Sequence, residues 1–241
     1  MFDTLAEVLT FYQKKDANRH EIIFKEFDKN IQNYFSDISN AFKIADGFGE
    51  LAFCWHWYLL VSSMSDNFKF IEIGVYKGRI LGIIHLLAKQ LNKQCEIYGL
   101  TPLTNTGDKY SVYNDENYSY TLLQNLSKMN VNFDNINIIK GYSTDADKIA
   151  EANQTGPYDI VFIDGCHDYD VVCQDIVNYL PMLKIGGYLV MDDASLFIDN
   201  PYGGFLGHED VCKAIRDNID NNSNLIHLFA IGHNRIWQKI N

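Results

Sequence analysis

Three aspartates and a histidine follow two apolar segments of the chain. Asp164 ends the first of these segments, and His167 lies three positions later. Asp192 and Asp193 end the second. If both segments are strands of one parallel sheet, their carboxyl ends meet and these side chains lie close together. Carboxylate oxygens are the ligands that Mg²⁺ prefers, so Asp164, Asp192 and Asp193 are predicted to bind a metal. Helix capping is the alternative role for Asp164 and Asp193.

The histidine of this group is the predicted general base. An imidazole with a pKa near ~6.5 can take a proton from a substrate hydroxyl, so His167 is the candidate base. Asp164, in the same loop, is the second candidate catalytic residue. His208 and His233 lie beside glycines in loops near the C-terminus. They are weaker candidates for contact with substrate or for a structural role.

A glycine-containing turn follows the apolar segment at residues 69–74. Gly74 and Gly78 would let the backbone approach a ligand closely. Tyr76 occupies the place of the second glycine in the G-x-G-x-x-G pattern, which argues against a dinucleotide site. Glu72, two residues before Gly74, suits a cationic ligand. An ordinary strand-to-helix turn is the alternative.

Strand-like and helix-like segments alternate from residue 67 onward. The expected strands are 69–74, 95–100, 136–141, 158–164 and 187–192, and the expected helices between them are 80–91, 120–129, 146–152 and 171–183. This alternation predicts an α/β fold, a parallel sheet with helices on both faces. A helix at 211–218 and a hairpin of strands at 226–231 and 235–239 follow, which adds an antiparallel edge strand.

The first 66 residues show helical spacing of apolar residues in three stretches and no strand pattern. We interpret residues 1–66 as an N-terminal helical cap or oligomerisation element, and residues 67–241 as the catalytic domain. A homo-oligomer formed through the N-terminal helices is possible on this interpretation.

Composition narrows the classes of partner. The chain has 241 residues, 47% of them hydrophobic, and 20 basic against 31 acidic residues give a net charge of −11. That charge repels a nucleic-acid backbone, so a small-molecule substrate is expected. No apolar run reaches the length of a membrane helix and no secretion signal begins the chain, and five cysteines fit no disulfide framework. We therefore expect a cytoplasmic protein without a membrane partner.

The segment 101–117 is long, polar and rich in tyrosine, which makes it a candidate lid over a site. Tyr110, Tyr113, Tyr118 and Tyr120 could stack on a sugar or aromatic ring, or they could be solvated loop residues.

Three motifs, in order, resemble a known family. Residues 70–78, FIEIGVYKG, resemble the first motif of class I S-adenosylmethionine-dependent methyltransferases. Residues 163–169, IDGCHDY, are similar to the DGxHxY motif of the branch that contains macrolide sugar O-methyltransferases and cephalosporin-hydroxylase-like proteins. Residues 184–193, KIGGYLVMDD, resemble that branch's fifth-strand motif. The resemblance spans about residues 68–240.

The resemblance implies a Rossmann-like, seven-stranded methyltransferase sheet and a set of site residues. Glu72, Gly74 and Gly78 would hold the amino-acid end of S-adenosylmethionine, with Tyr76 in the same loop. Ser143 would lie near the adenine, and Asp164 at the boundary of cofactor and substrate. Metal-dependent members use the carboxylates that correspond to Asp164, Asp192 and Asp193.

One position departs from the family pattern. The second strand usually ends in an acid that binds the ribose hydroxyls, and Thr101 stands there in this chain. A threonine accepts one hydrogen bond where a carboxylate binds both hydroxyls. Thr101 remains a candidate cofactor residue, and Asp108 in the following loop is a candidate substitute.

Together these observations predict an S-adenosylmethionine-dependent O-methyltransferase that acts on a hydroxyl of a small polar substrate, a sugar or sugar conjugate, with Mg²⁺ as a candidate second cofactor. Two alternatives stay open. One is a non-catalytic binding or assembly protein that keeps the fold. The other is a nicotinamide-dependent oxidoreductase, which the missing second glycine disfavours.

Overall fold

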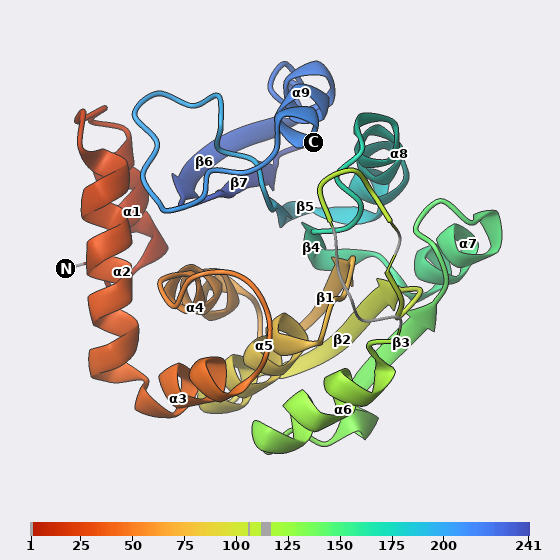
Figure 1. The fold of residues 1–241 in the computed structure, drawn as a ribbon. Helices are drawn as coiled ribbons and strands as arrows, with labels where there is room; N and C mark the ends of the chain where they lie inside the picture. Colours follow the sequence, from red (N-terminus) through yellow and green to blue (C-terminus); the bar gives the residue numbers. More distant parts are fainter. Residues whose placement is uncertain (1, 106, 112–116) are drawn as a thin grey trace.

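One seven-stranded sheet organises the part of the chain that the computed structural model describes, residues 2–105, 107–111 and 117–241 (Figure 1). The strand order is β3-β2-β1-β4-β5-β7-β6. Strands β1 to β5 are parallel, and β7 is antiparallel to both β5 and β6. The strands are β1 (Asn67–Ile73), β2 (Gln94–Thr101), β3 (Ile136–Lys140), β4 (Tyr158–Ile163), β5 (Leu183–Met191), β6 (Leu225–Ile231) and β7 (Asn234–Lys239). The predicted α/β fold is confirmed, with the antiparallel strand one place inside the edge strand β6.

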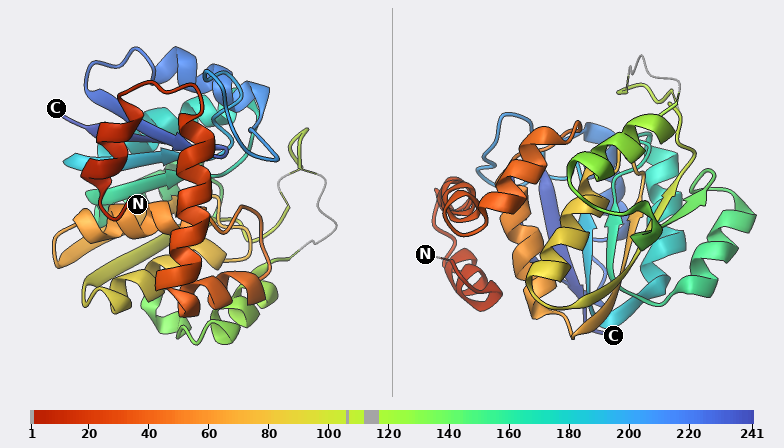
Figure 2. Two further views of the ribbon diagram at one scale, coloured as in Figure 1. Left: turned by 90° about the vertical axis from the view of Figure 1, so that its left-hand side faces the viewer. Right: turned by 90° about the horizontal axis from the view of Figure 1, so that it is seen from below.

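Helices cover both faces of the sheet (Figure 2). The helices are α1 (Leu5–Tyr12), α2 (Arg19–Tyr34), α3 (Ser36–Ile44), α4 (Phe53–Ser63), α5 (Arg79–Gln90), α6 (Ser119–Lys128), α7 (Ala146–Thr155), α8 (Tyr169–Tyr179) and α9 (Glu209–Asn218). Alternate strand residues point to opposite faces, so Phe70 joins the core beneath α1–α6 and Ile71 the core beneath α7–α9. None of these helices, within the described residues, has the length and apolar content that crossing a bilayer requires.

The N-terminal helices share a core with the sheet. Val8 of α1, Ile23 of α2 and Trp57 of α4 are fully or almost fully buried in one cluster with Phe229 of β6. Helix α3 was not predicted, because its serines, asparagine and aspartate have low helix propensity; it forms because Ile38 and its neighbours pack inward. The division at residue 66 stays a prediction.

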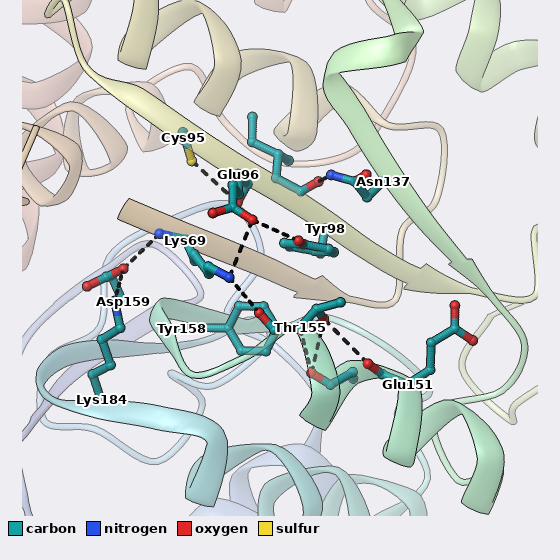
Figure 3. Close-up of polar contacts among 12 residues, drawn as sticks. Lys69, Cys95, Glu96, Tyr98, Asn137, Glu151, Thr155, Tyr158, Asp159 and Lys184 are labelled. Atoms are coloured by element: carbon teal, nitrogen blue, oxygen red, sulfur yellow. Dashed lines mark hydrogen bonds and ion pairs between the residues drawn. The ribbon is translucent and has the colours of Figure 1, made fainter. Parts of the chain in front are cut away.

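A polar network ties the strands together at their amino ends (Figure 3). Asp159 of β4 accepts hydrogen bonds from the Lys69 backbone of β1 and from Lys184 Nζ of β5, each at 2.7 Å. Lys69 Nζ donates to Thr155 O at 2.9 Å and pairs with Glu96 of β2 at 3.3 Å. These contacts fix the mutual register of four strands at the end opposite their carboxyl termini.

Helix α8 carries a buried acid, Asp175, that makes no ion pair with the described residues. Asp175 on α8 is fully buried, and neither carboxylate oxygen has a hydrogen-bond partner among the described residues. Burial raises the pKa of Asp175 to about 7, and the nearby Ser143 offsets only part of the shift because it forms no well-aligned hydrogen bond. The carboxylate lies behind Gly165, where an added Cβ would be 3.3 Å from Asp175 Oδ2.

We expect Asp175→Asn to stabilise the protein at neutral and alkaline pH. Between about pH 4 and pH 7 the folded chain holds a proton on Asp175 that the unfolded chain has lost, so the wild-type free energy of unfolding falls as pH rises through this range. The variant has no carboxyl group to ionise, so its free energy of unfolding does not fall in this way. Each unit of pKa shift corresponds to ~1.4 kcal/mol, so the free energy of unfolding of the variant should exceed that of the wild type by a few kcal/mol at about pH 8. Urea denaturation of both proteins across this range measures it. A difference between the two proteins that does not change with pH would contradict the assignment.

Candidate functional site

A cavity of about 760 Å³ lies at the carboxyl ends of the parallel strands. Its walls come from the loops after β1, β2, β3, β4 and β5, from the β6–β7 turn, and from the segment 47–50 between α3 and α4. This is the edge of the sheet where open α/β folds bind ligands. Its volume is in the range of small-molecule and cofactor sites.

The carboxyl end of strand β1 places a buried acid, Glu72, in this cavity. Glu72 is only 3% exposed, and its Oε2 has no hydrogen-bond partner among the described residues. Burial, with a smaller contribution from the charge of Asp192, raises the pKa of Glu72 well above its usual range. A cationic ligand would compensate this carboxylate, so Glu72 fits the predicted contact with an ammonium group.

The turn after β1 runs directly against the turn after β4. Gly74 has a φ of +94°, and a Cβ at this position would lie 2.0 Å from the carbonyl oxygen of Asp164. The Asp164 backbone N–H donates to Ile73 O at 2.8 Å. Only glycine permits both the left-handed conformation and this approach, which opens the floor of the cavity to a ligand.

The remaining predicted cofactor residues line the same cavity. Tyr76 stacks on Phe48 at 5.1 Å between ring centroids with an interplanar angle of 18°. Ser143 follows β3 and lines the wall nearest α8. Thr101 Oγ1 donates to Val75 O at 2.9 Å and accepts from the Leu103 N–H at 3.1 Å, so this hydroxyl holds the turn after β2.

Asp108 faces the catalytic candidates. Its Oδ2 lies 3.1 Å from His167 Nδ1 and 3.0 Å from the hydroxyl of Ser111, and its Oδ1 accepts from the Tyr110 and Ser111 backbones. Asp108 therefore orients His167, and the hypothesis that it substitutes for a ribose-binding acid has no support in these contacts. Tyr113 and the middle of the predicted lid, residues 112–116, lie outside the described residues.

Three aspartates converge as predicted from the ends of β4 and β5. Burial together with the charges of Asp192 and Asp193 raises the pKa of Asp164 well above its usual range. Burial also raises the pKa of Asp192 to about 6. Burial acts in the same direction on Asp193, but the hydrogen bond and charge of His167, together with the charges of His233 and His208, outweigh it and lower the pKa of Asp193. The cluster is therefore short of positive charge.

An acidic side chain lies beside each ring nitrogen of His167. Nδ1 faces Asp108 Oδ2 and Nε2 faces Asp193 Oδ2, both at 3.1 Å. Burial opposes the charged form, but the hydrogen bonds to Asp108 and Asp193 outweigh it and raise the pKa of His167 to about 10. With both acids in place, His167 is an imidazolium at neutral pH.

The two weaker histidine candidates also reach the aspartates. His208 stacks on Tyr110 at 4.3 Å between centroids, and its Nε2 lies 3.4 Å from Asp193 Oδ2. His233 lies with Nε2 3.3 Å from Asp192 Oδ1 and Nδ1 3.5 Å from Glu50 Oε2. The structure therefore brings every predicted site residue to one cavity.

Two sets of side chains in the described part of the chain have the geometry to hold a metal ion. One is His167, Asp193 and His208, and the other is Asp192, Asp193 and His233; in each set the ligand atoms lie within 4.8 Å of one another. Asp164, a predicted ligand, belongs to neither set, although the charge of Asp192 acts on it. Sequence reasoning missed the imidazoles as ligands because the three aspartates alone carried that prediction.

Residues from the N-terminal third were also missed. Glu50 and Phe53 reach the cavity from the start of α4 and the segment before it. Nothing in their local spacing indicates a site, because the contact depends on how α4 packs against the sheet. Phe205, between β5 and α9, was missed for the same reason; it packs at 5.1 Å from His208 and 5.3 Å from His233.

Comparison with known proteins was made on sequence and on structure. Residues 71–194 match a family described as a methyltransferase domain. An uncharacterised protein of Acanthamoeba polyphaga mimivirus is 34% identical over 130 residues, which cover 53% of this chain and 52% of that protein. The chain thus spans about half the length of this curated relative.

Solved structures share the fold at low identity. An O-methyltransferase from Bacillus cereus in complex with S-adenosylhomocysteine is 14% identical with a TM-score of 0.61, over 92% of this chain and 99% of that one. The MycE methyltransferase of the mycinamycin biosynthetic pathway, in complex with Mg, S-adenosylhomocysteine and mycinamycin VI, is 17% identical with a TM-score of 0.52, over 88% of this chain and 60% of that one. Both likenesses concern the fold.

We expect Asp108→Asn to lower the pKa of His167. The substitution removes one of the two charges that stabilise the imidazolium, and the loss of an opposite charge at this distance lowers a pKa by about one to three units. A histidine ¹H–¹⁵N NMR titration measures the change. Asp147→Asn, on the exposed face of α7, is the matched control and should leave the titration of His167 in place. An unchanged His167 pKa in the Asp108 variant would show that Asp193 alone sets it.

Proposed function

The chain belongs to the methyltransferase-domain family that matches residues 71–194, and we propose that it transfers the methyl group of S-adenosylmethionine to a hydroxyl oxygen of a small polar substrate. The observation that carries this proposal is the unpaired, buried Glu72 beside the open glycine turn of β1. That pairing offers a negative charge and close backbone approach, and S-adenosylmethionine carries an ammonium and a sulfonium.

The cofactor-binding residues follow from this placement. When bound, S-adenosylmethionine supplies a methyl group activated by positive sulfur. Glu72 binds its ammonium, Gly74 and Gly78 give the backbone room, and Ser143 lies toward the adenine. Asp164 lies against Gly74, and the charges of Asp192 and Asp193 act on it. Thr101 and Tyr76 line the wall and would lie beside the bound cofactor.

His167 is the proposed base. Asp108 holds Nδ1–H, which directs Nε2 toward Asp193 and the interior of the cavity. When another positive or hydrogen-bonding group engages Asp193, one of the two acids that stabilise the imidazolium is lost, and the pKa of His167 falls toward the working range of a base. Nε2 then accepts the proton of the substrate hydroxyl. The main contribution of the chain is to hold that oxygen in line with the methyl group.

The proposed acceptor is a sugar or sugar conjugate. The motif resemblance to sugar O-methyltransferases favours it, and MycE, a structural neighbour, is named with mycinamycin VI. Tyr110 and Phe205 flank His208 and offer aromatic faces on which a sugar ring can pack. His208 and His233 would contact substrate or the groups that hold it.

The acid cluster fits a divalent cation such as Mg²⁺. Asp164, Asp192 and Asp193 are carboxylates, the raised pKa values of Asp164 and Asp192 show a deficit of positive charge, and hard oxygen ligands suit this ion. A cation held there would lower the pKa of a nearby hydroxyl.

Calorimetric titration with S-adenosylhomocysteine tests the cofactor. We expect 1:1 binding by the wild type, and Glu72→Gln should weaken it at least tenfold because the charge that holds the ammonium is gone. Thermal unfolding of the variant should be unchanged or higher, since a buried charge has been removed.

Glu96→Gln is the control, because Glu96 is an exposed acid at the opposite end of the sheet. Absence of heat at millimolar S-adenosylhomocysteine, with and without Mg²⁺, would overturn the proposal and favour a non-catalytic binding protein or a nicotinamide cofactor.

His167→Ala should lower kcat for methyl transfer to a sugar acceptor by about 10² to 10⁴-fold, the usual contribution of a general base. Affinity for S-adenosylhomocysteine should stay within about twofold, because His167 does not belong to the cofactor wall. Release of S-adenosylhomocysteine measures turnover. Unchanged turnover in the variant would remove His167 from the proton transfer.

A further inference from the structure

The β6–β7 turn presents a histidine whose two nitrogens face acids from different parts of the chain. His233 is 6% exposed; its Nε2 lies 3.3 Å from Asp192 Oδ1 at the end of β5, and its Nδ1 lies 3.5 Å from Glu50 Oε2, just before α4. Neither pair of atoms forms a hydrogen bond of good geometry. Among the described residues, His233 Nδ1 and Glu50 Oε2 have no hydrogen-bond partner.

The ring of His233 is held firmly in this orientation. Phe53 packs edge-on against it at 4.8 Å between centroids, and Phe205 at 5.3 Å. The His233 carbonyl accepts a hydrogen bond from the Ala194 N–H at 2.7 Å, which ties the turn to the residue after the twin aspartates. At Gly232, φ is +54° and a Cβ would lie 2.7 Å from Phe53. Nε2 therefore points at the aspartates because Phe53 and Phe205 pack against the ring and the turn is tied to Ala194.

The separation between Nε2 and Asp192 matches two ligands of one ion. Charge-assisted hydrogen bonds are usually ~2.7–2.9 Å long. Two ligand atoms, each about 2.1 Å from a metal, lie about 3.0–3.4 Å apart at octahedral or tetrahedral angles. The observed 3.3 Å falls in the second range. Asp192, Asp193 and His233 also form one of the two sets whose ligand atoms all lie within 4.8 Å.

We propose that His233 Nε2 is a nitrogen ligand of a divalent cation held together with Asp192 and Asp193, and that Glu50 Oε2, 3.5 Å from Nδ1, is the acid that favours the Nδ1–H form of the ring when the cation is bound. The inference rests on the cation site of the proposed function and assigns its ligands and its metal class. Imidazole suits Fe²⁺, Ni²⁺, Cu²⁺ and Zn²⁺, whereas Mg²⁺ prefers oxygen; Mn²⁺ accepts both kinds of ligand and gives a spectroscopic signal. The site therefore selects a transition metal over Mg²⁺. A carboxylate on the second nitrogen is the usual companion of a metal-bound histidine.

His233 is a better ligand than the two other histidines near the aspartates. His167 Nδ1 is hydrogen-bonded to Asp108 Oδ2, and its Nε2, 3.1 Å from Asp193, is the nitrogen that the proposed base needs for the proton. The His208 side chain is 21% exposed and faces a single acid, and Tyr110 holds its ring. His233 alone of the three combines near-complete burial with a supporting carboxylate from the N-terminal region.

Pulsed EPR of the Mn²⁺-loaded protein tests the ligand directly. The wild type should show coupling of manganese to ¹⁴N, and His233→Gln should abolish it. His85→Gln, a partly buried histidine of α5 outside the cavity, should keep the coupling and controls for general effects of the substitution. Circular dichroism and thermal unfolding confirm that each variant is folded.

Calorimetry of metal binding tests the selectivity. Wild type should bind Mn²⁺ at least tenfold more tightly than the His233→Gln variant, while Mg²⁺ affinity should change by less than about threefold. Glu50→Gln should weaken Mn²⁺ binding by about 10 to 100-fold, the usual effect of losing the carboxylate behind a metal-bound histidine.

Several outcomes would overturn the inference. Nitrogen coupling that persists in His233→Gln, or that disappears in His208→Gln instead, would move the ligand to another ring. Equal losses of Mn²⁺ and Mg²⁺ affinity would make His233 structural only. A wild type that binds S-adenosylhomocysteine but no cation refutes this inference and leaves methyl transfer standing. A wild type with the coupling but without S-adenosylhomocysteine binding refutes the proposed function alone.

Discussion

Repulsion between buried carboxylates is the constraint around which this protein is built. The ends of β1, β4 and β5 bring four acids to one edge of the sheet: Glu72, Asp164, Asp192 and Asp193. Removing such charges from water is costly unless positive groups accompany them. Among the described residues, His167, His208 and His233 lie beside the β5 aspartates, and Glu72 Oε2 has no hydrogen-bond partner. This uneven compensation is the basis for proposing a cationic ligand at Glu72 and proton and metal chemistry at the histidines.

The N-terminal helices take part in this balance. Helix α4 buries Trp57 against the sheet, and the same packing brings Glu50 and Phe53 onto His233. Arg79, in the first turn of α5, donates to the carbonyls of Ala45 and Phe48 and so fastens the segment before α4 to the helix that follows the glycine turn. The electrostatics of the β5 aspartates therefore depend on residues that precede the sheet in sequence.

Sequence patterns predicted the sheet and the convergence of acids well, because both depend on local periodicity and on the rule that parallel strands present their carboxyl ends together. They failed where the cause is tertiary. Helix α3 has poor intrinsic propensity, Glu50 carries no local signal, and Asp108 is oriented by a loop that folds back on His167. Asp175 was overlooked because an acid in an amphipathic helix is ordinarily solvated, whereas here α8 turns it inward.

The polar network of Lys69, Asp159 and Lys184 secures the strands at their amino ends, at the edge of the sheet opposite the cavity. Because strand register is secured there, insertions and substitutions in the loops at the opposite edge do not put strand pairing at risk. Under the proposed function, the loop after β2, the segment between β5 and α9 and the residues before α4 line the acceptor side of the cavity, and they can diverge without loosening the sheet. Such changes would exchange one acceptor for another while the residues proposed to hold the methyl donor stay constant.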